Sequence, residues 1–499
     1  MLINEDLAKE LAEKVLNICM EVAKDAHIFL GTHDIHKLKS YYRFPVSSVE
    51  DLINNAAFDD EVKEKVHFFK YEIPKYYLSE IPEGMENYDA IFNGYQSEKI
   101  IIHEYVCYKE LIGWIENNQE VKKLFIKSNN ADYEYRLRNL IRNCIERYLF
   151  VVKATADVPV DLKDKMFHVV EESLRYYLEE KLYIDICVPV CLAVFEEDNI
   201  VLSDNIEIVR MTDTFQMSRQ KACTYEVNGE DWVAACATHM IVIRNYYYNN
   251  VDDFSLNAAT QDYNLYPLRE IDKIFGIIRL VTGYSLGYEQ ILSRPLEWMY
   301  DSCADLPVVY GAKAHFVHPK EIKKFWMSIQ VSVISKEQCE RIRELYLKFV
   351  ESEDKIQFAL SRFNRCMLRD EIDDMSTDAC IGLESLLAGG TKGEITYTIS
   401  NRIPIVFANN STELYSANNC RALMKKIYNF RSKIVHGGKL KENEKYVDVN
   451  EVKVFVPKMA VEFLRYVLIY MIENPEYLDV TKIDSYIDEA IGNSITKNP

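Results

Sequence analysis

An arginine and a histidine stand near the end of one predicted amphipathic helix, at Arg431 and His436. An imidazole accepts and donates a proton near neutral pH, and a guanidinium neutralises charge on a phosphate. Both groups are needed to cleave a phosphodiester without a metal ion. Chance alone gives about one Arg-to-His match of this spacing in a chain of this composition. The surrounding residues must therefore decide whether the pair has a function.

The residues from Glu413 to His436 follow helical spacing. A buried stripe is predicted by the apolar residues Leu423, Ile427, Phe430 and Ile434. A polar stripe is formed by Lys425, Asn429, Ser432 and His436. Arg431 lies on the flank between the two stripes, in line with Met424, Tyr428 and Val435.

The end of this helix is marked by Gly437 and Gly438, which can form a left-handed cap. The helix dipole favours the protonated form of an imidazole in the last turn, which suits His436 for proton transfer. Ser432 precedes it by one turn, and we expect its hydroxyl to reach the ring.

A basic segment surrounds the pair, although the 499-residue chain carries 59 Lys and Arg against 78 Asp and Glu, a net charge of −19. Between Leu414 and Lys441 the chain has no acidic residue and seven cations: Arg421, Lys425, Lys426, Arg431, Lys433, Lys439 and Lys441. A single basic segment on an acidic protein would attract a polyanion to one place. A solvated helix face balanced by acidic neighbours is the alternative.

The motif Arg-Ser-x-Ile-Val-His-Gly from Arg431 to Gly437 follows a tyrosine-bearing helix. Together with Ile381–Leu387, which contains Glu384, and with Arg362–Arg365, it resembles the C-terminal HEPN domain of the ApeA-like family. The common HEPN pattern has Asn, Asp or His directly after the arginine, where this chain has Ser432. That departure puts the role of the polar residue in question.

The resemblance implies an all-helical domain and a metal-independent ribonuclease that pairs two copies, as a homodimer or higher homo-oligomer, to complete its site. It also implies a role in abortive defence against bacteriophage, with the nuclease restrained until a trigger such as a phage-derived molecule releases it. No cofactor and no metal are expected. The products would be a 2′,3′-cyclic phosphate and a 5′-hydroxyl. A non-catalytic HEPN module serving as a protein-interaction or dimerisation scaffold is the alternative.

Chemical roles for the candidate residues follow from this reaction. His436 would transfer protons and Arg431 would stabilise phosphate charge, while Ser432 and Asn429 would orient the ring. Lys425 and Lys433 would hold the incoming RNA strand. Glu384 lies in an apolar stretch, so we expect a cationic partner, either Arg402 or Arg431, and leave open a structural or a direct catalytic role.

Length and composition predict a protein of two or three domains. The 12 cysteines include no Cys-x-x-Cys pair, which favours reduced cytosolic thiols over a zinc site or disulfide framework. The acidic N-terminus and the absence of a long uncharged apolar run predict a cytoplasmic protein without a membrane partner.

Periodicity predicts an α+β multidomain protein. We expect a mainly helical N-terminal region at 1–175, a strand-rich mixed region at 176–332 and a HEPN-like all-α domain at 333–499. Within the middle region, Ile184–Val190 reads as a strand that Pro189 either cuts short or places at a sheet edge. In the last region, we predict five helices at Lys336–Met367, Ser376–Ala388, Glu394–Arg402, Glu413–His436 and Pro457–Glu473.

Overall fold

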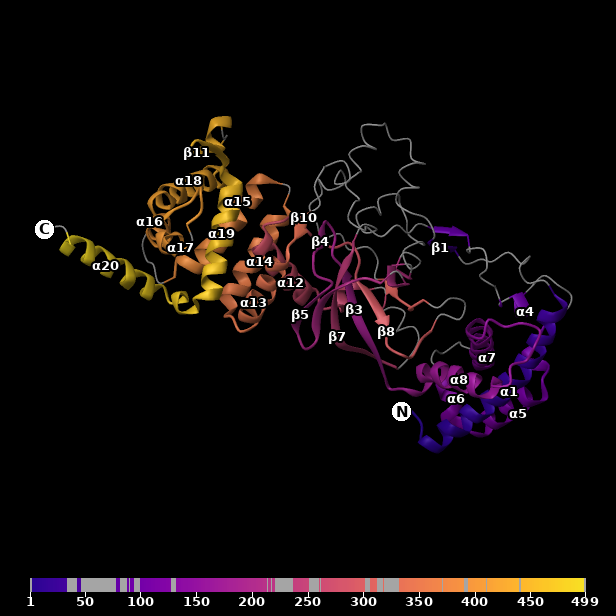
Figure 1. Cartoon of the computed structure of the whole chain (residues 1–499). Coiled ribbons are helices and arrows are strands. Elements are labelled where there is room, and N and C mark those ends of the chain that lie inside the picture. Colours follow the sequence, from indigo (N-terminus) through magenta and orange to yellow (C-terminus); the bar gives the residue numbers. More distant parts are fainter. Residues whose placement is uncertain are drawn as a thin grey trace, which may run out of the picture. The chain divides into compact units, whose positions relative to one another are not determined.

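The structure is a computed structural model of the whole chain. It describes residues 2–33, 43–45, 78–80, 88, 90–93, 99–126, 132–212, 214–216, 218–219, 237–250, 260, 262–300, 306–311, 317, 332–369, 371–389, 394–409, 411–438 and 441–497. The described residues mix helices and strands, with the strands concentrated in the middle of the sequence (Figure 1). Within these ranges, no helix combines the length and the apolar character that crossing a membrane requires.

The chain divides into two compact units that alternate along the sequence. Unit 1 comprises Met1–Pro189, Val209–Tyr266 and Gln290–His315. Unit 2 comprises Val190–Ile208, Pro267–Glu289 and Phe316–Pro499. The residues of the predicted strand-rich region are thus shared between the two units.

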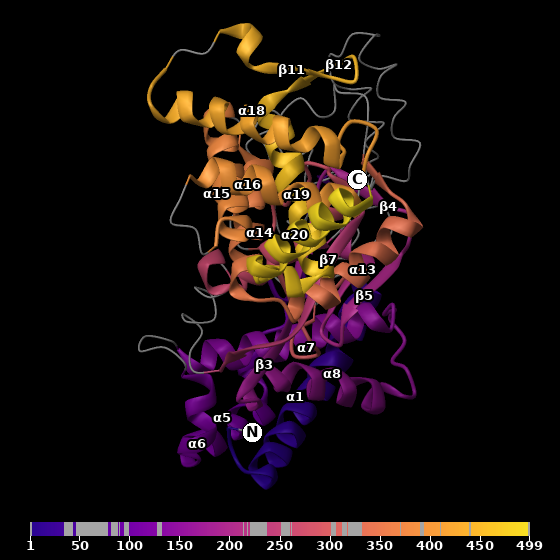
Figure 2. The same ribbon diagram turned by 90° about the vertical axis from the view of Figure 1, so that its left-hand side faces the viewer.

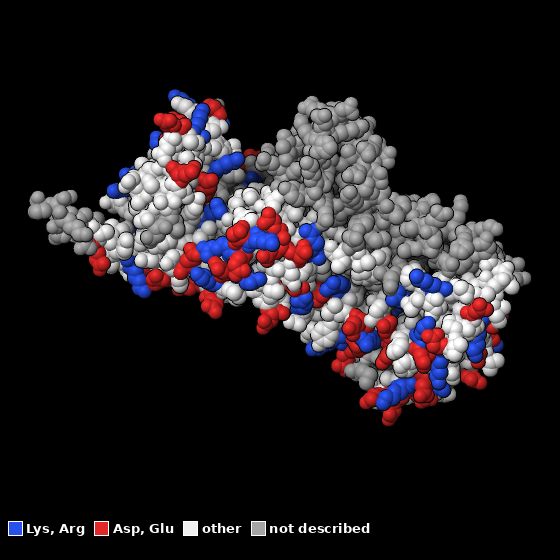
Figure 3. Space-filling view, in the orientation of Figure 1, with Lys and Arg blue, Asp and Glu red and all other residues white. Residues whose placement is uncertain are grey.

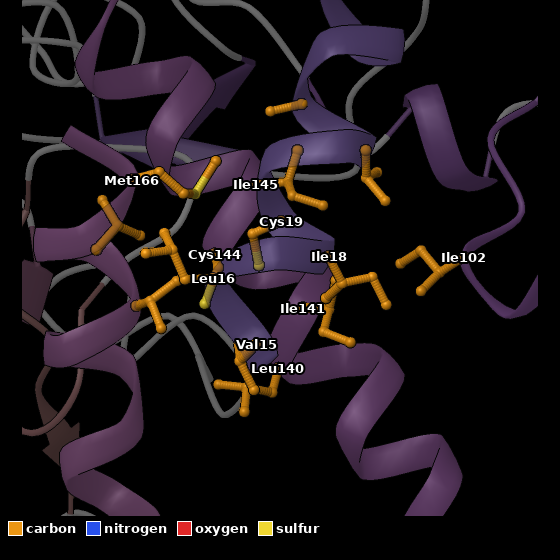
Figure 4. Close-up of a cluster of buried hydrophobic side chains, with 14 of the residues drawn as sticks. Val15, Leu16, Ile18, Cys19, Ile102, Leu140, Ile141, Cys144, Ile145 and Met166 are labelled. Atoms are coloured by element: carbon orange, nitrogen blue, oxygen red, sulfur yellow. The ribbon is translucent and has the colours of Figure 1, made fainter. Parts of the chain in front are cut away.

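Unit 1 begins with a bundle of helices, as the periodicity predicts. Its main members are α1 (Glu5–Thr32), α5 (Val106–Asn117), α6 (Gln119–Phe125), α7 (Tyr133–Val151) and α8 (Leu162–Leu178). Helix α1 begins where the Asn4 side chain accepts the Leu7 N–H at 2.9 Å, an N-cap that satisfies one free amide. Figure 4 shows the core that results, with side chains of α1 such as Ile18 and Cys19 gathered near Ile141 and Cys144 of α7.

A buried histidine fixes the end of α1 in this bundle. The His27 ring is fully buried, and its Nδ1 lies 2.6 Å from the Thr155 carbonyl oxygen. Since a carbonyl only accepts, Nδ1 carries the proton, and Nε2 accepts the Tyr148 hydroxyl at 3.1 Å. Both ring nitrogens are therefore satisfied inside the core, which marks His27 as structural.

Four strands of unit 1 follow one another in a sheet in the order β7-β3-β8-β9. They are β3 (Lys181–Pro189), β7 (His239–Asn249), β8 (Leu292–Pro295) and β9 (Tyr310–Gly311), and neighbours run antiparallel. Strand β3 lies between β7 and β8, so placing it at a sheet edge is wrong. It ends at Pro189, because proline has no N–H to continue the ladder.

Unit 2 is mainly helical, as predicted for its C-terminal part. Its helices are α12 (Leu268–Thr282), α13 (Lys336–Val350), α14 (Asp354–Leu368), α15 (Ile372–Leu387), α16 (Ile395–Arg402), α17 (Pro404–Asn409), α18 (Ala417–Val435), α19 (Val456–Glu473) and α20 (Val480–Lys497). A short parallel pair joins β4 (Ala193–Phe195) to β10 (Ser332–Ile334). Helices α15, α18 and α19 contact one another and carry the candidate site (Figure 2).

The remaining described elements are short. They are β1 (Arg43–Pro45), β2 (Leu78–Glu80), α4 (Ala90–Asn93), β5 (Asn199–Ser203), β6 (Ile206–Arg210) and the 3-10 turns η3 (Ile102–Glu104), η4 (Tyr263–Leu265), η6 (Glu442–Glu444) and η7 (Pro475–Leu478).

The predicted single helix Lys336–Met367 is wrong, because the chain forms α13 and α14 with a break between them. Glu351 ends α13, and Glu353 is extended at ψ 157° before α14 begins. Acidic side chains are unfavourable at the negative end of one helix and favourable at the positive end of the next. The run Glu351-Ser352-Glu353-Asp354 therefore ends one helix and begins another.

The expectation of an all-α C-terminal domain is also wrong. A hairpin of β11 (Tyr446–Val449) and β12 (Val452–Phe455) joins α18 to α19 (Figure 2). Asn450 and Glu451 form its two-residue turn, both with positive φ, at 48° and 66°. This is the geometry of a type I′ turn, whose twist matches that of the strands. The Asn450 side-chain amide also donates to the Glu413 carbonyl at 2.8 Å, which ties the hairpin tip to the residues before α18.

Candidate functional site

Helix α18 presents the candidate residues much as the sequence predicts. Its buried side chains are Cys420, Leu423, Met424, Ile427, Tyr428 and Phe430. The polar stripe of Lys425, Asn429, Ser432 and His436 is exposed. The amphipathic pattern therefore sets which face of α18 packs into unit 2 and which face meets solvent.

The predicted glycine cap is confirmed. His436 is the C-cap residue, and Gly437 adopts a left-handed φ of 69°. The Gly438 N–H donates to the Lys433 carbonyl at 2.8 Å, and the Gly437 N–H donates to the Ile434 carbonyl at 2.9 Å. This pair of bonds is a Schellman motif, which satisfies carbonyls left free at the helix end. The cap holds His436 at the last turn with its side chain exposed.

Glu384 has a different partner from the one expected. The Tyr428 hydroxyl donates to Glu384 Oε1 at 3.1 Å, linking α18 to α15. Arg402 instead reaches both carboxylate oxygens of Asp484, at 2.8 and 2.7 Å, and the Leu387 carbonyl at 2.6 Å. No ion pair joins Glu384 to Arg402 or Arg431, so the predicted cationic partner is wrong. The neutral phenol of Tyr428 gives the carboxylate a hydrogen-bond donor, so no second charged group has to be buried.

Arg431 lies close enough to this cluster to act on it electrostatically. Burial raises the pKa of Tyr428, the Cys380 thiol and the Glu384 carboxylate raise it further, and the Arg431 guanidinium opposes the rise. Burial likewise raises the pKa of Cys380 to about 12, with Glu384 adding to the effect and Arg431 opposing it. The arginine is half-buried, and its Nε is enclosed without a hydrogen-bond partner. Its charge therefore acts on groups inside the helical bundle, including Cys380 of α15.

No hydrogen bond joins Arg431 and His436 within the chain. Five residues of α-helix correspond to a rotation of about 140°, so the two side chains leave the helix in different directions. The arginine is half-buried at the flank and the imidazole is exposed. In this chain alone, the pair presents two separate groups and not a preassembled catalytic dyad.

The predicted support of the His436 ring by Ser432 is not formed. The Ser432 carbonyl accepts the His436 backbone N–H at 3.1 Å, as in any helix, but its hydroxyl makes no hydrogen bond to the ring. Asn429 is exposed on the same stripe and makes no side-chain bond to the ring either. Both residues remain available to a bound molecule.

Lys433 is engaged by an acidic residue beyond the helix. Its Nζ lies 2.5 Å from Glu444 Oε1, in the turn η6. Lys425, in contrast, extends into solvent from the exposed stripe. Arg421, Lys426 and Lys441 are also exposed, whereas Lys439 lies outside the described residues.

The surface of the described part of the chain is not uniformly basic. On the face shown in Figure 3, lysines and arginines alternate with aspartates and glutamates over α13 and the N-terminal helices. A groove of about 750 Å³ lies at the opposite end of α18, lined in part by Ala417, Arg421, Tyr397 and Tyr486. It includes neither Arg431 nor His436, so the candidate chemistry sits on an open helix end and not in this groove. Among the described residues, no group of three His, Cys, Asp or Glu is placed to hold a metal ion.

The contacts of three residues in this neighbourhood were not predicted from the sequence. Tyr428 stands one turn before Arg431 on the same flank, and that spacing is a usable signal. Cys380 precedes Glu384 by one turn on α15, which gives a weaker one. Glu444 carries no local signal, because its approach to Lys433 depends on the path of the connecting segment.

Comparison of the chain with known protein families, curated proteins and solved structures found no match. The resemblance to the ApeA-like HEPN domain therefore rests on the residues of α14, α15 and α18 described above.

Proposed function

We propose that this protein is a metal-independent endoribonuclease of the HEPN type, cleaving RNA to 2′,3′-cyclic phosphate and 5′-hydroxyl ends. One observation carries the proposal. An exposed histidine caps a cationic helix, and a half-buried arginine, Arg431, precedes it by five residues. These are the residue types that acid–base cleavage of a phosphodiester needs, at the spacing of the motif that resembles HEPN domains.

The reaction uses the neutral imidazole as base and the imidazolium as acid. The base removes the 2′-hydroxyl proton, the 2′-oxygen attacks phosphorus, and the bond from phosphorus to the 5′-oxygen breaks as that oxygen takes a proton. A guanidinium stabilises the charge on the pentacoordinate phosphorane. One chain supplies one histidine, so we assign the second proton transfer to a second copy related by two-fold symmetry.

The separation of Arg431 and His436 within one chain supports such pairing. Because the two side chains leave α18 in different directions, a phosphate at one imidazole receives its guanidinium more readily from the symmetry mate. Lys425 is free to contact the RNA backbone, as are Asn429 and Ser432. We place the protein in the cytoplasm, where RNA is present and where the nine described cysteines would remain free thiols.

The cleavage test uses purified protein and total RNA in EDTA. The wild type is expected to cut, and His436→Ala is expected to lose cleavage while keeping its fold, since the ring is exposed. His168→Ala is the matched control, because His168 is another exposed helical histidine, on α8. Loss of cleavage in EDTA by the wild type, or unchanged cleavage by His436→Ala, would contradict the proposal. Products with 3′ ends lacking a phosphate would also contradict it.

The proposed biological role is abortive defence against bacteriophage, with the nuclease restrained until infection. Cells expressing the wild type are expected to limit phage growth, and cells expressing His436→Ala are expected to lose that protection. Equal protection by both proteins would favour the second candidate function, a non-catalytic scaffold. That candidate is supported by the engagement of Arg431 with the α15 cluster and of Lys433 with Glu444.

A further inference from the structure

The segment after α18 folds back and places a carboxylate on the helix end. Glu444 Oε1 accepts from Lys433 Nζ at 2.5 Å, and Glu444 Oε2 accepts from the backbone N–H of Lys441 at 3.0 Å. One oxygen of the carboxylate is thus held by the ammonium at the end of α18. The other accepts from the N-cap residue of η6, three residues before Glu444, in a capping box. The hydrogen bond from Lys433 comes first, and that from Lys441 second, among the causes that lower the pKa of Glu444.

The donors around this carboxylate are those that hold phosphate groups in proteins. An ammonium supplies charge, and a backbone N–H supplies a fixed donor to an anionic oxygen. A carboxylate and a phosphodiester both present two oxygens that share a negative charge. The same ammonium and amide can therefore donate hydrogen bonds to either anion.

This anion position is next to the candidate catalytic histidine. Lys433 and His436 are three residues apart in the last turn, and residues at that spacing are neighbours on a helix surface. A phosphate held by Lys433 would lie on the same end of α18 as the imidazole. Such a position suits a phosphate adjacent to the one being cleaved.

The ion pair is accessible and easily exchanged. The Lys433 side chain is 48% exposed and that of Glu444 is 32% exposed. Exposed pairs of this kind are weak, because water and salt compete with both partners. A strand of RNA that brings several phosphates at once can displace a single carboxylate.

We infer that Lys433 and the backbone amide of Lys441 form a phosphate subsite beside His436, which Glu444 occupies in the free protein and which the RNA backbone takes over on binding. This inference rests on the proposed function and adds to it a group within the chain that competes with RNA. Glu444 acts as an internal competitor, and it lowers the affinity for RNA without blocking the site.

The test measures binding of single-stranded oligo(U) to the His436→Ala protein, so that cleavage does not interfere, over a range of salt concentrations. Adding Glu444→Gln is expected to raise the affinity for oligo(U) about five-fold near 0.1 M salt. It is also expected to make the slope of log K against log salt concentration steeper by about 0.7, the value for one more phosphate contact. Glu442→Gln is the matched control. It makes the same change in net charge two residues away, but Glu442 pairs with Lys445, at 2.9 Å, and not with α18.

Lys433→Ala completes the comparison. In that background Glu444→Gln is expected to give no gain beyond that of Glu442→Gln, because the freed ammonium is absent. Equal effects of Glu444→Gln and Glu442→Gln with Lys433 present would overturn the subsite, even if the wild type cleaves RNA. If the wild type binds oligo(U) through Lys433 but does not cleave RNA, the proposed ribonuclease fails and the subsite stands. Circular dichroism of each variant verifies that the fold is retained.

Discussion

At the scale of single residues, the candidate site has an ordered interior and an exposed exterior. Tyr428 and Glu384 are joined by a hydrogen bond, with the Cys380 thiol beside them. His436 and the polar stripe remain exposed. The sequence predicts the stripes and the cap because these depend on neighbours three and four residues away. It does not predict the partner of Glu384, because 44 residues separate it from Tyr428.

Tyr428→Phe tests this interior bond. Removing the hydroxyl is expected to lower the free energy of unfolding by about 1 kcal/mol, since Glu384 loses its hydrogen-bond donor. Urea denaturation measures the change. Tyr397→Phe is the control, because the Tyr397 side chain is 57% exposed and its loss of a hydroxyl should leave stability unchanged. Equal effects of the two substitutions would show that the Tyr428 bond contributes nothing.

The buried thiol of Cys380 is expected to make the free energy of unfolding fall as the pH rises above about 9. The unfolded chain releases the thiol proton near pH 9, whereas the folded protein retains it to about pH 12 because burial disfavours the thiolate. The pKa is raised on folding, so this contribution is complete below about pH 9 and is lost as the pH rises toward about 12. Cys380→Ala is expected to reduce the loss of stability by up to about 1.4 kcal/mol per pH unit in this window.

The control for that measurement is Val467→Ala, which also truncates a fully buried side chain, in α19, but does not titrate. It should lower the free energy of unfolding by a similar amount at every pH. If denaturation curves for Cys380→Ala and Val467→Ala keep the same pH slope as the wild type, the buried thiol is not the cause.

At the scale of helices and strands, periodicity and end signals predict most of unit 2. The helix expected at Glu394–Arg402 and the one at Pro457–Glu473 form within one residue of the predicted bounds. The first ends before Pro404, and the second has Pro457 in its first turn. The break between α13 and α14 was missed because the apolar spacing continues across it, although the acidic run marks it. The hairpin was missed because its turn, Asn450-Glu451, lacks the glycine that usually signals such a turn.

Two glycine substitutions test how α18 ends. Gly437→Ala is expected to destabilise unit 2 by about 1 kcal/mol, because its φ of 69° is unfavourable for a residue with a Cβ. Gly113→Ala should instead stabilise unit 1 by up to about 1 kcal/mol, because Gly113 lies inside α5 and, apart from the adjacent helix backbone, nothing lies within 4 Å of the added Cβ. Thermal unfolding distinguishes the two. A stabilising Gly437→Ala would contradict the left-handed cap.

At the scale of the whole molecule, the proposed ribonuclease depends on association of two copies. Excess His436→Ala protein is expected to suppress cleavage by a fixed amount of wild type, because mixed pairs contain one imidazole where two proton transfers are needed. Adding the same excess of an unrelated acidic protein controls for dilution and for RNA sequestration. Cleavage that stays constant as His436→Ala is added would indicate that one chain is sufficient.

The alternation of the two units also sets the order in which their parts are synthesised. The chain passes from one unit to the other five times, after Pro189, Ile208, Tyr266, Glu289 and His315. A ribosome must therefore release about two thirds of the polypeptide before the sheet of unit 1 has all its strands. Because α18 and α19 are synthesised later still, a chain that stops before Ala417 lacks the helix end on which the proposed site depends.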